Sequence, residues 1–316
     1  MTARSPAYQS RPLGFPHMTE AESDRRLGIA LVIAAAVAWS TAAFFTRLLP
    51  LDAWTILFWR GLFGGSLIAI FHLLIEGKSG LRDLFRLGKG GWLVASLSAL
   101  GMVAFIPALQ TTSVANVAII IATQPFVAAA LAFLWFREKA RMQTLLASLV
   151  ALAGVAIIVS DAQSFADISG IALACLMILA VSGMTVAIRR YRQTSMVAAA
   201  AISNFLGSLV SIPFAEGVAS VSGHQLFILA MFGFCQVALG LTFFTLGSRH
   251  LPSGQAALIG TIETPLMPFW IWLAFHDVPT AHAFIGGTMV MGAVVFDIVG
   301  SGRMRAPQPR PSELAP

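Results

Sequence analysis

The feature that most constrains this chain is a series of long apolar segments, separated only by short polar or Gly- and Pro-containing connections. Each segment is close to the roughly 20 apolar residues that an α-helix needs to cross a bilayer. The segments predict helices at 28–48, 54–75, 91–110, 114–136, 142–160, 168–188, 195–214, 224–248, 254–275 and 281–300. We therefore expect an all-α integral membrane protein with ten transmembrane helices.

The composition excludes a water-soluble globule. Only 11% of the residues are charged, whereas a soluble domain has roughly 25%, and the mean hydropathy is +0.82. Cys175 and Cys235 lie in apolar runs without the C-x-x-C spacing of a zinc or redox site. We expect no metal and no cofactor.

The basic residues indicate how the helices cross the membrane, because cytoplasmic loops concentrate Lys and Arg. With a cytoplasmic N-terminus, eighteen of the 20 basic residues fall in segments on that side. The opposite loops instead carry the acids Asp52, Asp161, Asp167, Glu216 and Asp277. One span more or fewer would destroy this segregation, so both termini are expected in the cytoplasm. The net charge of +6 is then an orientation signal and predicts no nucleic-acid partner.

The chain also matches itself at a nearly constant offset. Gly-Ile-Ala-Leu begins at Gly28 and again at Gly170, and Pro125 pairs with Pro265. Each half contains five predicted spans, an odd number, so the two copies are inverted relative to each other. Inverted repeats are typical of transporters that place the substrate between the halves and work by alternating access. The expected organisation is a cytoplasmic tail, two five-helix repeats and a disordered cytoplasmic tail, at 1–27, 28–160, 168–300 and 301–316.

Several motifs carry a resemblance to a known family. They are Trp39, Ser40, Thr41 and Phe44 in the first span, Arg60 in the second, the stretch 108–115 and Pro125 in the fourth, Phe243 to Gly247 and Ser253 to Gln255. With these residues the chain resembles the EamA-type permeases of the drug/metabolite transporter superfamily, over 28–300. The resemblance implies a bacterial inner-membrane carrier, often an exporter, of small metabolites or drugs.

Two positions depart from the pattern of that family. The fourth span ends at Arg137-Glu138, where the family usually shows Gly-Glu. The ninth ends at His276-Asp277, where the acid of the family is expected. The second departure weakens any role for an acid at the end of the ninth span.

Glu263 is an acidic residue predicted near the middle of a span. It follows Gly254 by nine residues, or about 13.5 Å of helix, in a core roughly 30 Å thick. A charge at the bilayer centre costs about 2.5 to 3.5 kcal/mol and is functional by default. The functional interpretation is a carboxylate that carries a proton or binds a cation. The alternative is a carboxylate that a neighbouring helix neutralises and that serves only packing.

Arg60 lies six residues inside the external end of the second span, about 9 Å deep. It is a candidate for binding an anionic substrate group or for gating, and could reach Glu263 if their helices are adjacent. The alternative is a side chain that extends to the external interface. Arg47, at the end of the first span, is expected to anchor the helix at that interface.

Two proline-interrupted helices in equivalent positions of the halves point to a binding site at the midplane. Gln124 with Pro125 in the fourth span and Thr264 with Pro265 in the ninth form such a pair. The prolines are candidates for helix breaks that take part in gating, and the polar residues for substrate or ion contacts. Prolines also kink helices for packing alone, so both interpretations stay open.

Trp39, Ser40 and Thr41 form a polar and aromatic group at the middle of the first predicted span. The indole could stack on a ligand while the hydroxyl groups bond to it. Packing in the core is the alternative interpretation. These residues complete the set of candidate site residues.

The expected function is that of a secondary transporter in the bacterial inner membrane. The sequence contains no P-loop, and no cytoplasmic segment is long enough for an ATPase. The expected partners are a small-molecule substrate, the lipid bilayer and a proton or other ion, with the oligomeric state open. A structural or sensory membrane protein is one alternative. An intramembrane enzyme is another, but no His-Glu-x-x-His motif and no midspan histidine is present.

Overall fold

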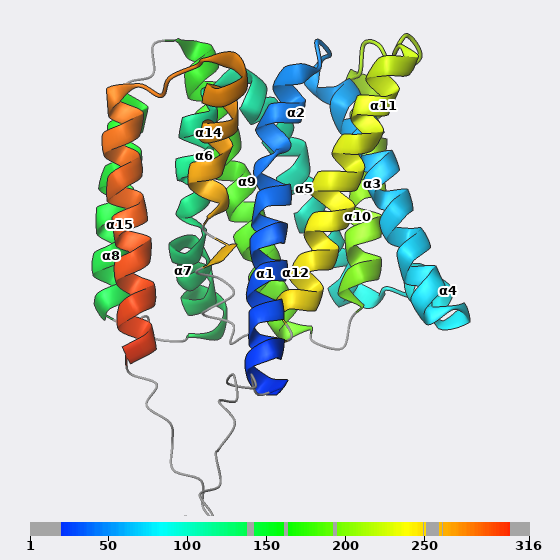
Figure 1. Ribbon diagram of the computed structural model, residues 1–316, viewed down its shortest axis with the longest axis horizontal. Helices are drawn as coiled ribbons and strands as arrows, with labels where there is room; N and C mark the ends of the chain where they lie inside the picture. The colour runs from blue at the N-terminus through cyan, green and yellow to red at the C-terminus, as the bar shows by residue number, and fades with distance from the viewer. Residues whose placement is uncertain are drawn as a thin grey trace, which may run out of the picture.

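The computed structural model describes residues 20–137, 142–160, 164–191, 195–248, 250, 259–260 and 262–303. Within these ranges all regular structure is helical, and the long helices run side by side in one bundle (Figure 1). The beginning of the first helix and the end of the last lie at the same, lower end of the bundle in this view. The predicted tails fall mostly outside the described residues.

The first half contains α1 (Glu20–Ser40), α2 (Ala42–Leu48), α3 (Ala53–Glu76), α4 (Lys78–Phe85), α5 (Gly88–Thr111), α6 (Val114–Ala122), α7 (Gln124–Phe136) and α8 (Met142–Ser160). The second half contains α9 (Phe165–Arg190), α10 (Met196–Ser211), η1 (Ile212–Phe214), α11 (Gly223–Phe232), η2 (Gly233–Leu239), α12 (Gly240–Ser248), α14 (Glu263–Phe275) and α15 (Ala281–Arg303). Here η1 is a 3₁₀ turn and η2 is a π-helix.

The helices confirm a protein that crosses a membrane several times. Six described helical stretches are long and apolar enough to span a bilayer, and α6 with α7, bent by 43°, makes a seventh. The helices α8 and α15 are shorter apolar helices that fall at the predicted fifth and tenth spans. In the ninth predicted span, residues 254–258 and 261 lie outside the described part. Ten spans and cytoplasmic termini therefore stay predictions.

Polar side chains cap several of the helices that begin at the upper end of the bundle. Asp52 accepts bonds from the backbone N–H groups of Trp54 and Thr55 at the start of α3, at 3.0 and 2.9 Å. Ser113 accepts from Asn116 at the start of α6, and Ser222 begins α11 in a capping box. Such caps satisfy backbone donors that have no partner within the helix.

The main helix contacts join one repeat to the other. The predicted spans 2 and 7 pack as α3 on α10, spans 5 and 10 as α8 on α15, and spans 4 and 9 as α6 on α14. Span 1 packs on span 8 as α1 on α12, and span 3 on span 6 as α5 on α9. A twofold axis that exchanges the repeats maps each of these pairs onto itself or onto another pair. The bundle therefore has the contacts of two interleaved inverted repeats.

Two half-helices show the same symmetry in detail. Both α7 and α14 have 13 residues and follow an interruption of the predicted fourth and ninth spans. Both end in a left-handed residue, Arg137 at φ 55° and His276 at φ 57°. The N–H of each donates to a carbonyl four residues earlier, on Phe133 and Trp272, at 2.9 Å. Both copies thus end this half-helix with the same backbone geometry.

Small residues allow α8 and α15 to approach each other closely. A Cβ atom added at Gly154 would lie 2.8 Å from the carbonyl oxygen of Gly286 and 2.9 Å from a methyl group of Val290. At the lower end of this pair Thr144 donates to Asp297 at 2.7 Å. The contact between these two helices is therefore made within a single chain.

We expect Gly154→Ala to lower the stability of the protein by about 1 to 3 kcal/mol, because the added methyl group overpacks the interface between α8 and α15. Gly292→Ala on α15 is the matched control, since a Cβ there meets nothing within 4 Å. Unfolding by heat or SDS in detergent micelles measures both variants. Equal stability of the two variants would contradict the close contact.

Candidate functional site

Arg60 is a charged residue enclosed by the bundle. Its side chain is 1% exposed, and Nη1 donates a hydrogen bond to Oε1 of Gln236 on η2. The guanidinium carbon lies 5.3 Å from the ring centre of Phe232, the last residue of α11. Because α3, α11 and η2 surround the side chain, it does not extend to the external interface in this conformation.

The bonding of the Arg60 guanidinium is incomplete. Its Nε is buried and has no hydrogen-bond partner. Among the ion pairs of the described residues, none joins Arg60 to a carboxylate. A buried charge needs both hydrogen bonds and a countercharge to offset its desolvation. Arg60 therefore has room in its bonding for an anionic group that is not part of the described chain.

The π-helix η2 places Gln236 against Arg60. Such helices are rare and occur frequently at functional sites. A Cβ at Gly233 would lie 2.9 Å from the backbone nitrogen of Gly64 and 3.0 Å from the carbonyl oxygen of Arg60, so only glycine fits without a shift. A sequence pattern has no signal for a π-helix, and this element was not predicted.

The predicted proline interruptions lie at or next to helix ends near the middle of the bundle. The turn at Thr123 separates α6 from α7, which begins with Gln124 and Pro125. The carbonyl of Gln124 accepts a bond from Ser182 on α9 at 3.4 Å. In Figure 1, α6 and α14 occupy the upper half and α7 the lower half. Because α6 and α14 are in contact, the two interruptions lie at the lower ends of neighbouring half-helices.

Glu263 is the first residue of α14 and its side chain is half-buried. Thr264 is 5% exposed, whereas Pro265 is exposed. Trp270 follows Glu263 by seven residues, nearly two full turns, so the two side chains share a face of the helix. Trp270 contacts Ser40 of α1, and Glu263 therefore lies on the face of α14 that is turned toward α1.

The polar group at the end of α1 is engaged in contacts within the bundle. Ser40 is fully buried and accepts a bond from Nε1 of Trp270 at 2.8 Å. Trp39 packs on Phe244 of α12 with 5.1 Å between ring centres. Thr41 donates to the carbonyl of Ala38 at 2.6 Å. Their use as ligand contacts stays a prediction, which requires these bonds to be exchanged.

Aromatic side chains of α2 contact both Phe232, which lies beside Arg60, and the end of α14. Phe45 of α2 stacks on Phe232 at 5.1 Å, and the adjacent Phe44 lies 6.0 Å from Phe275 at the end of α14. The rings of α2 thus contact both Phe232, which lies beside Arg60, and the upper end of α14, the end opposite to Glu263. No ion pair between Arg60 and Glu263 is found among the described residues.

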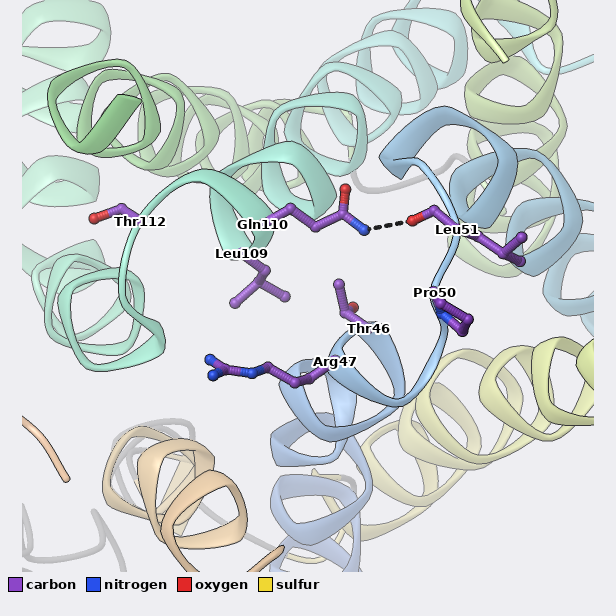
Figure 2. Close-up of a pocket in the computed structure, with 7 residues that line it drawn as sticks. All are labelled: Thr46, Arg47, Pro50, Leu51, Leu109, Gln110 and Thr112. Atoms are coloured by element: carbon purple, nitrogen blue, oxygen red, sulfur yellow. Dashed lines mark hydrogen bonds between the residues drawn. The ribbon is translucent and has the colours of Figure 1, made fainter. Parts of the chain in front are cut away.

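A pocket of about 390 Å³ opens between the ends of α2 and α5 (Figure 2). Its lining consists of Thr46, Arg47, Pro50, Leu51, Leu109, Gln110 and Thr112. Gln110 donates to the carbonyl of Leu51 at 2.9 Å, which ties the ends of α5 and α2 together. This pocket is a polar opening at the upper end of the bundle, here called the upper mouth, and the guanidinium group of Arg47 lines it.

Arg47 joins the two repeats at this mouth. It forms an ion pair with Asp277 at 2.9 Å, both side chains being about half exposed. Its guanidinium carbon also lies 5.7 Å from the ring centre of Phe275. The sequence suggested only an interfacial anchor, because nothing local relates Arg47 to a residue so distant in the chain.

The Arg60–Gln236 bond can be measured by a double-mutant cycle. We expect Gln236→Leu alone to cost about 1.5 to 3 kcal/mol of stability, because it removes a bond to a buried charge. In the Arg60→Leu/Gln236→Leu variant the loss is smaller than the sum of the single losses by about 1 to 3 kcal/mol. Unfolding in detergent gives the four free energies.

The same cycle with Asn116→Leu in place of Gln236→Leu serves as the control. Asn116 bonds to Thr112 in another part of the bundle, and distant sites add within about 0.5 kcal/mol. Additive losses for Arg60 and Gln236 would show that their bond contributes nothing to stability.

Comparisons with known proteins agree with this architecture. The chain is similar to a solved structure titled "Crystal structure of protein", with 18% identity and a TM-score of 0.60, over 88% of this chain and 99% of that one. This likeness concerns the fold alone. A search of curated proteins found no match. The model of the EamA-like transporter family matches twice, at residues 26–160 and 168–298. The two matches coincide with the two repeats, and the chain belongs to the EamA-like transporter family.

Proposed function

We propose that this chain is a secondary transporter that moves a small organic molecule by alternating access between its two repeats. Family membership indicates a membrane transporter of small molecules. The proposal adds export across the bacterial inner membrane, and coupling to protons through Glu263. The observation that carries it is a half-buried carboxylate at a mid-bundle helix end, on the face of α14 turned toward the other repeat.

The helix interruptions support a binding site at this level. The start of α14 and the end of α6 leave backbone groups without partners inside their own helices. In transporters such half-helix ends bind substrates and ions near the midplane. Gln124 and Thr264 flank these ends, and Pro125 and Pro265 keep the helices from closing into continuous rods. In this proposal the two prolines are the points about which the half-helices move.

Glu263 supplies the coupling in this proposal. A carboxylate can be neutral on one side of the transport cycle and ionised on the other, when its access to water changes. Trp39, Ser40 and Thr41 at the end of α1 lie near Trp270, on the same face of α14 as Glu263, and offer aromatic and hydroxyl contacts once their present bonds are exchanged. A substrate would then replace contacts between α1 and the second repeat, which couples binding to the movement of the repeats.

Arg60 is proposed to bind an anionic group of the substrate. The support is its free Nε and the lack of a carboxylate partner in the described chain. A purely structural role, holding α3 to η2, is the competing explanation. Esterification of the acidic group of a substrate separates the two roles. If Arg60 binds that group, esterification lowers transport by the wild-type protein and does not lower it further in a variant that lacks Arg60.

The Arg47–Asp277 ion pair is proposed to close the upper mouth. An exposed ion pair contributes about 0 to 1 kcal/mol, so thermal motion can break and reform it. It joins α2 of one repeat to the segment after α14 of the other. A weak contact in this place allows the repeats to part there without unfolding.

Glu263→Gln tests the proton coupling. In proteoliposomes screened with small metabolites and drugs, with and without a pH gradient, we expect the variant to lose proton-driven flux at least tenfold while it folds normally. The amide has nearly the same shape but cannot ionise. Glu216→Gln is the matched control, because Glu216 is an exposed residue of an upper loop. Undiminished and equally pH-dependent flux in Glu263→Gln would contradict a role of Glu263 in proton coupling.

Cross-linking tests the upper mouth. We expect Arg47→Cys/Asp277→Cys, joined by a short bis-maleimide in a background with Cys175→Ala and Cys235→Ala, to lose nearly all flux. A reagent that cleaves the linker restores it. The single cysteine variants treated in the same way should retain flux. Full activity of the cross-linked protein would show that the two repeats need not separate at this end.

A further inference from the structure

The short helix α4 projects from the lower end of the bundle (Figure 1). It follows α3 after a sharp turn at Gly77, whose φ of 56° favours glycine. The predicted spans did not include it, because its eight residues contain as many polar as apolar groups. It is a separate surface helix, attached to the end of the second span.

One side of α4 is held against the bundle. A Cβ at Gly80 would lie 3.0 Å from the carbonyl oxygen of His72 and 3.1 Å from the Cβ of Glu76, so this face touches α3 directly. Leu84 packs on the buried cluster formed by α5, α9 and α10. These contacts fix which side of the helix faces outward.

The outward side combines apolar and basic residues. Leu81 is 48% exposed and Phe85 is 83% exposed, and Lys78 and Arg82 are exposed as well. At 3.6 residues per turn, these four side chains fall within an arc of about 100°. A helix with exposed Leu and Phe beside Lys and Arg has the composition of one that lies in a membrane interface.

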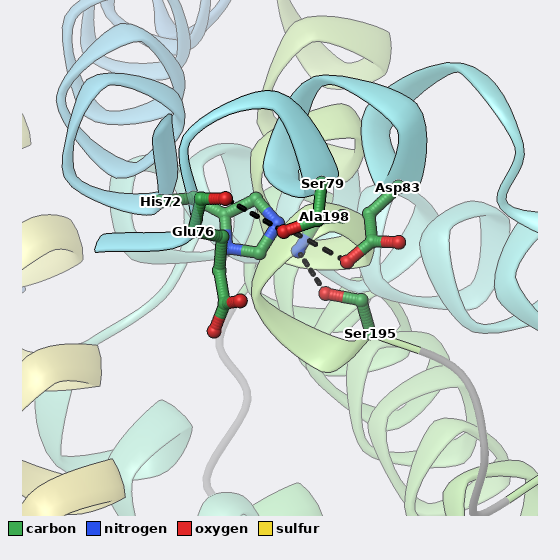
Figure 3. A network of polar contacts seen from close by, with 6 residues as sticks. All are labelled: His72, Glu76, Ser79, Asp83, Ser195 and Ala198. Atoms are coloured by element: carbon green, nitrogen blue, oxygen red, sulfur yellow. Dashed lines mark hydrogen bonds and ion pairs between the residues drawn. The ribbon is translucent and has the colours of Figure 1, made fainter. Parts of the chain in front are cut away.

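The acid of α4 is turned away from this side. The carboxylate of Asp83 lies 3.6 Å from Nε2 of His72, a side chain that is 7% exposed (Figure 3). Ser79 bonds to the carbonyl of Glu76 at 2.6 Å. Glu76, at the end of α3, is the nearest other acid in the sequence. The outward arc itself carries only positive charge, and exposed Arg86 and Lys89 continue it.

The position of α4 relative to the apolar belt fits an interfacial helix. The last turns of α3 expose Ile70, Phe71, Leu74 and Ile75, which form a lipid-facing surface. The helix α4 begins three residues after Ile75, where this surface ends. Its exposed apolar side chains therefore lie at the boundary between acyl chains and headgroups, and its basic groups at the level of the phosphates.

We propose that α4 is a docking surface for anionic phospholipids, with Leu81 and Phe85 inserted at the acyl boundary and Lys78 and Arg82 bound to headgroup phosphates. Positive charge next to a membrane-spanning helix attracts anionic lipids. Leu81 and Phe85 set the depth of the helix in the membrane interface, and Lys78 and Arg82 set the preference for anionic lipid. This surface does not depend on the proposed transport activity.

A nitroxide label on Phe85→Cys tests the proposal, in the full chain with Cys175→Ala and Cys235→Ala. The protein is placed in nanodiscs of phosphatidylcholine, with and without phosphatidylglycerol, and collisions with oxygen and with a water-soluble nickel chelate are measured. With phosphatidylglycerol we expect the ratio of oxygen to nickel collisions to rise several-fold. Lys78→Gln/Arg82→Gln should abolish the rise, because the attraction to phosphate is lost.

Two further labels make the outcome decisive. Leu81→Cys should respond as Phe85→Cys does, and Ser220→Cys, exposed at the other end of the bundle, should not respond to the lipid. A label at 85 that meets the nickel chelate equally in both lipids would overturn the docking. The same buried depth in both lipids, unchanged by the charge-neutral variant, would overturn the preference for anionic lipid.

Discussion

Contacts between helices of opposite repeats position the two charged residues of the bundle interior, Arg60 and Glu263. The contact of α3 with α11 and η2 encloses Arg60, and the contact of α1 with α14 turns Glu263 toward the first repeat. Glycine makes several of these approaches possible, as at Gly154 and Gly233, where a side chain would meet backbone atoms. Because most of the stabilising contacts join the repeats, any relative motion must exchange contacts rather than simply lose them.

The two interior charges are arranged differently, which assigns them different tasks in the proposed cycle. Arg60 is fixed by Gln236 and Phe232 and lacks a countercharge in the described chain. Glu263 is half-buried and is the first residue of α14. A fixed cation suits recognition, whereas a carboxylate at an interrupted helix suits a change of protonation. The helix α2 contacts Phe232 beside Arg60 and Phe275 at the far end of α14 from Glu263, and it also lines the upper mouth.

Local patterns predicted the helices well and the contacts poorly. The range 142–160 coincides with α8, and the interruption between α6 and α7 lies next to Pro125, because hydropathy and proline act locally. The π-helix was missed because its geometry depends on packing against Arg60 and Gly64. The ion pair of Arg47 with Asp277 was missed because the partners are far apart in the chain. The helix α4 was missed because it is short and only half apolar.

The accessibility of position 263 tests the central claim, that a midplane site opens alternately to the two sides. The measurement is the modification of Glu263→Cys, without the two native cysteines, by a membrane-impermeant thiol reagent added to one side of the membrane at a time. We expect modification from each side. The same modification is then measured in Glu263→Cys/Arg47→Cys/Asp277→Cys, after the bis-maleimide has joined positions 47 and 277 and while position 263 is still unmodified. We expect this cross-link to stop the modification of position 263 from the upper side only. Modification from one side alone, or from neither, would contradict alternating access at this site.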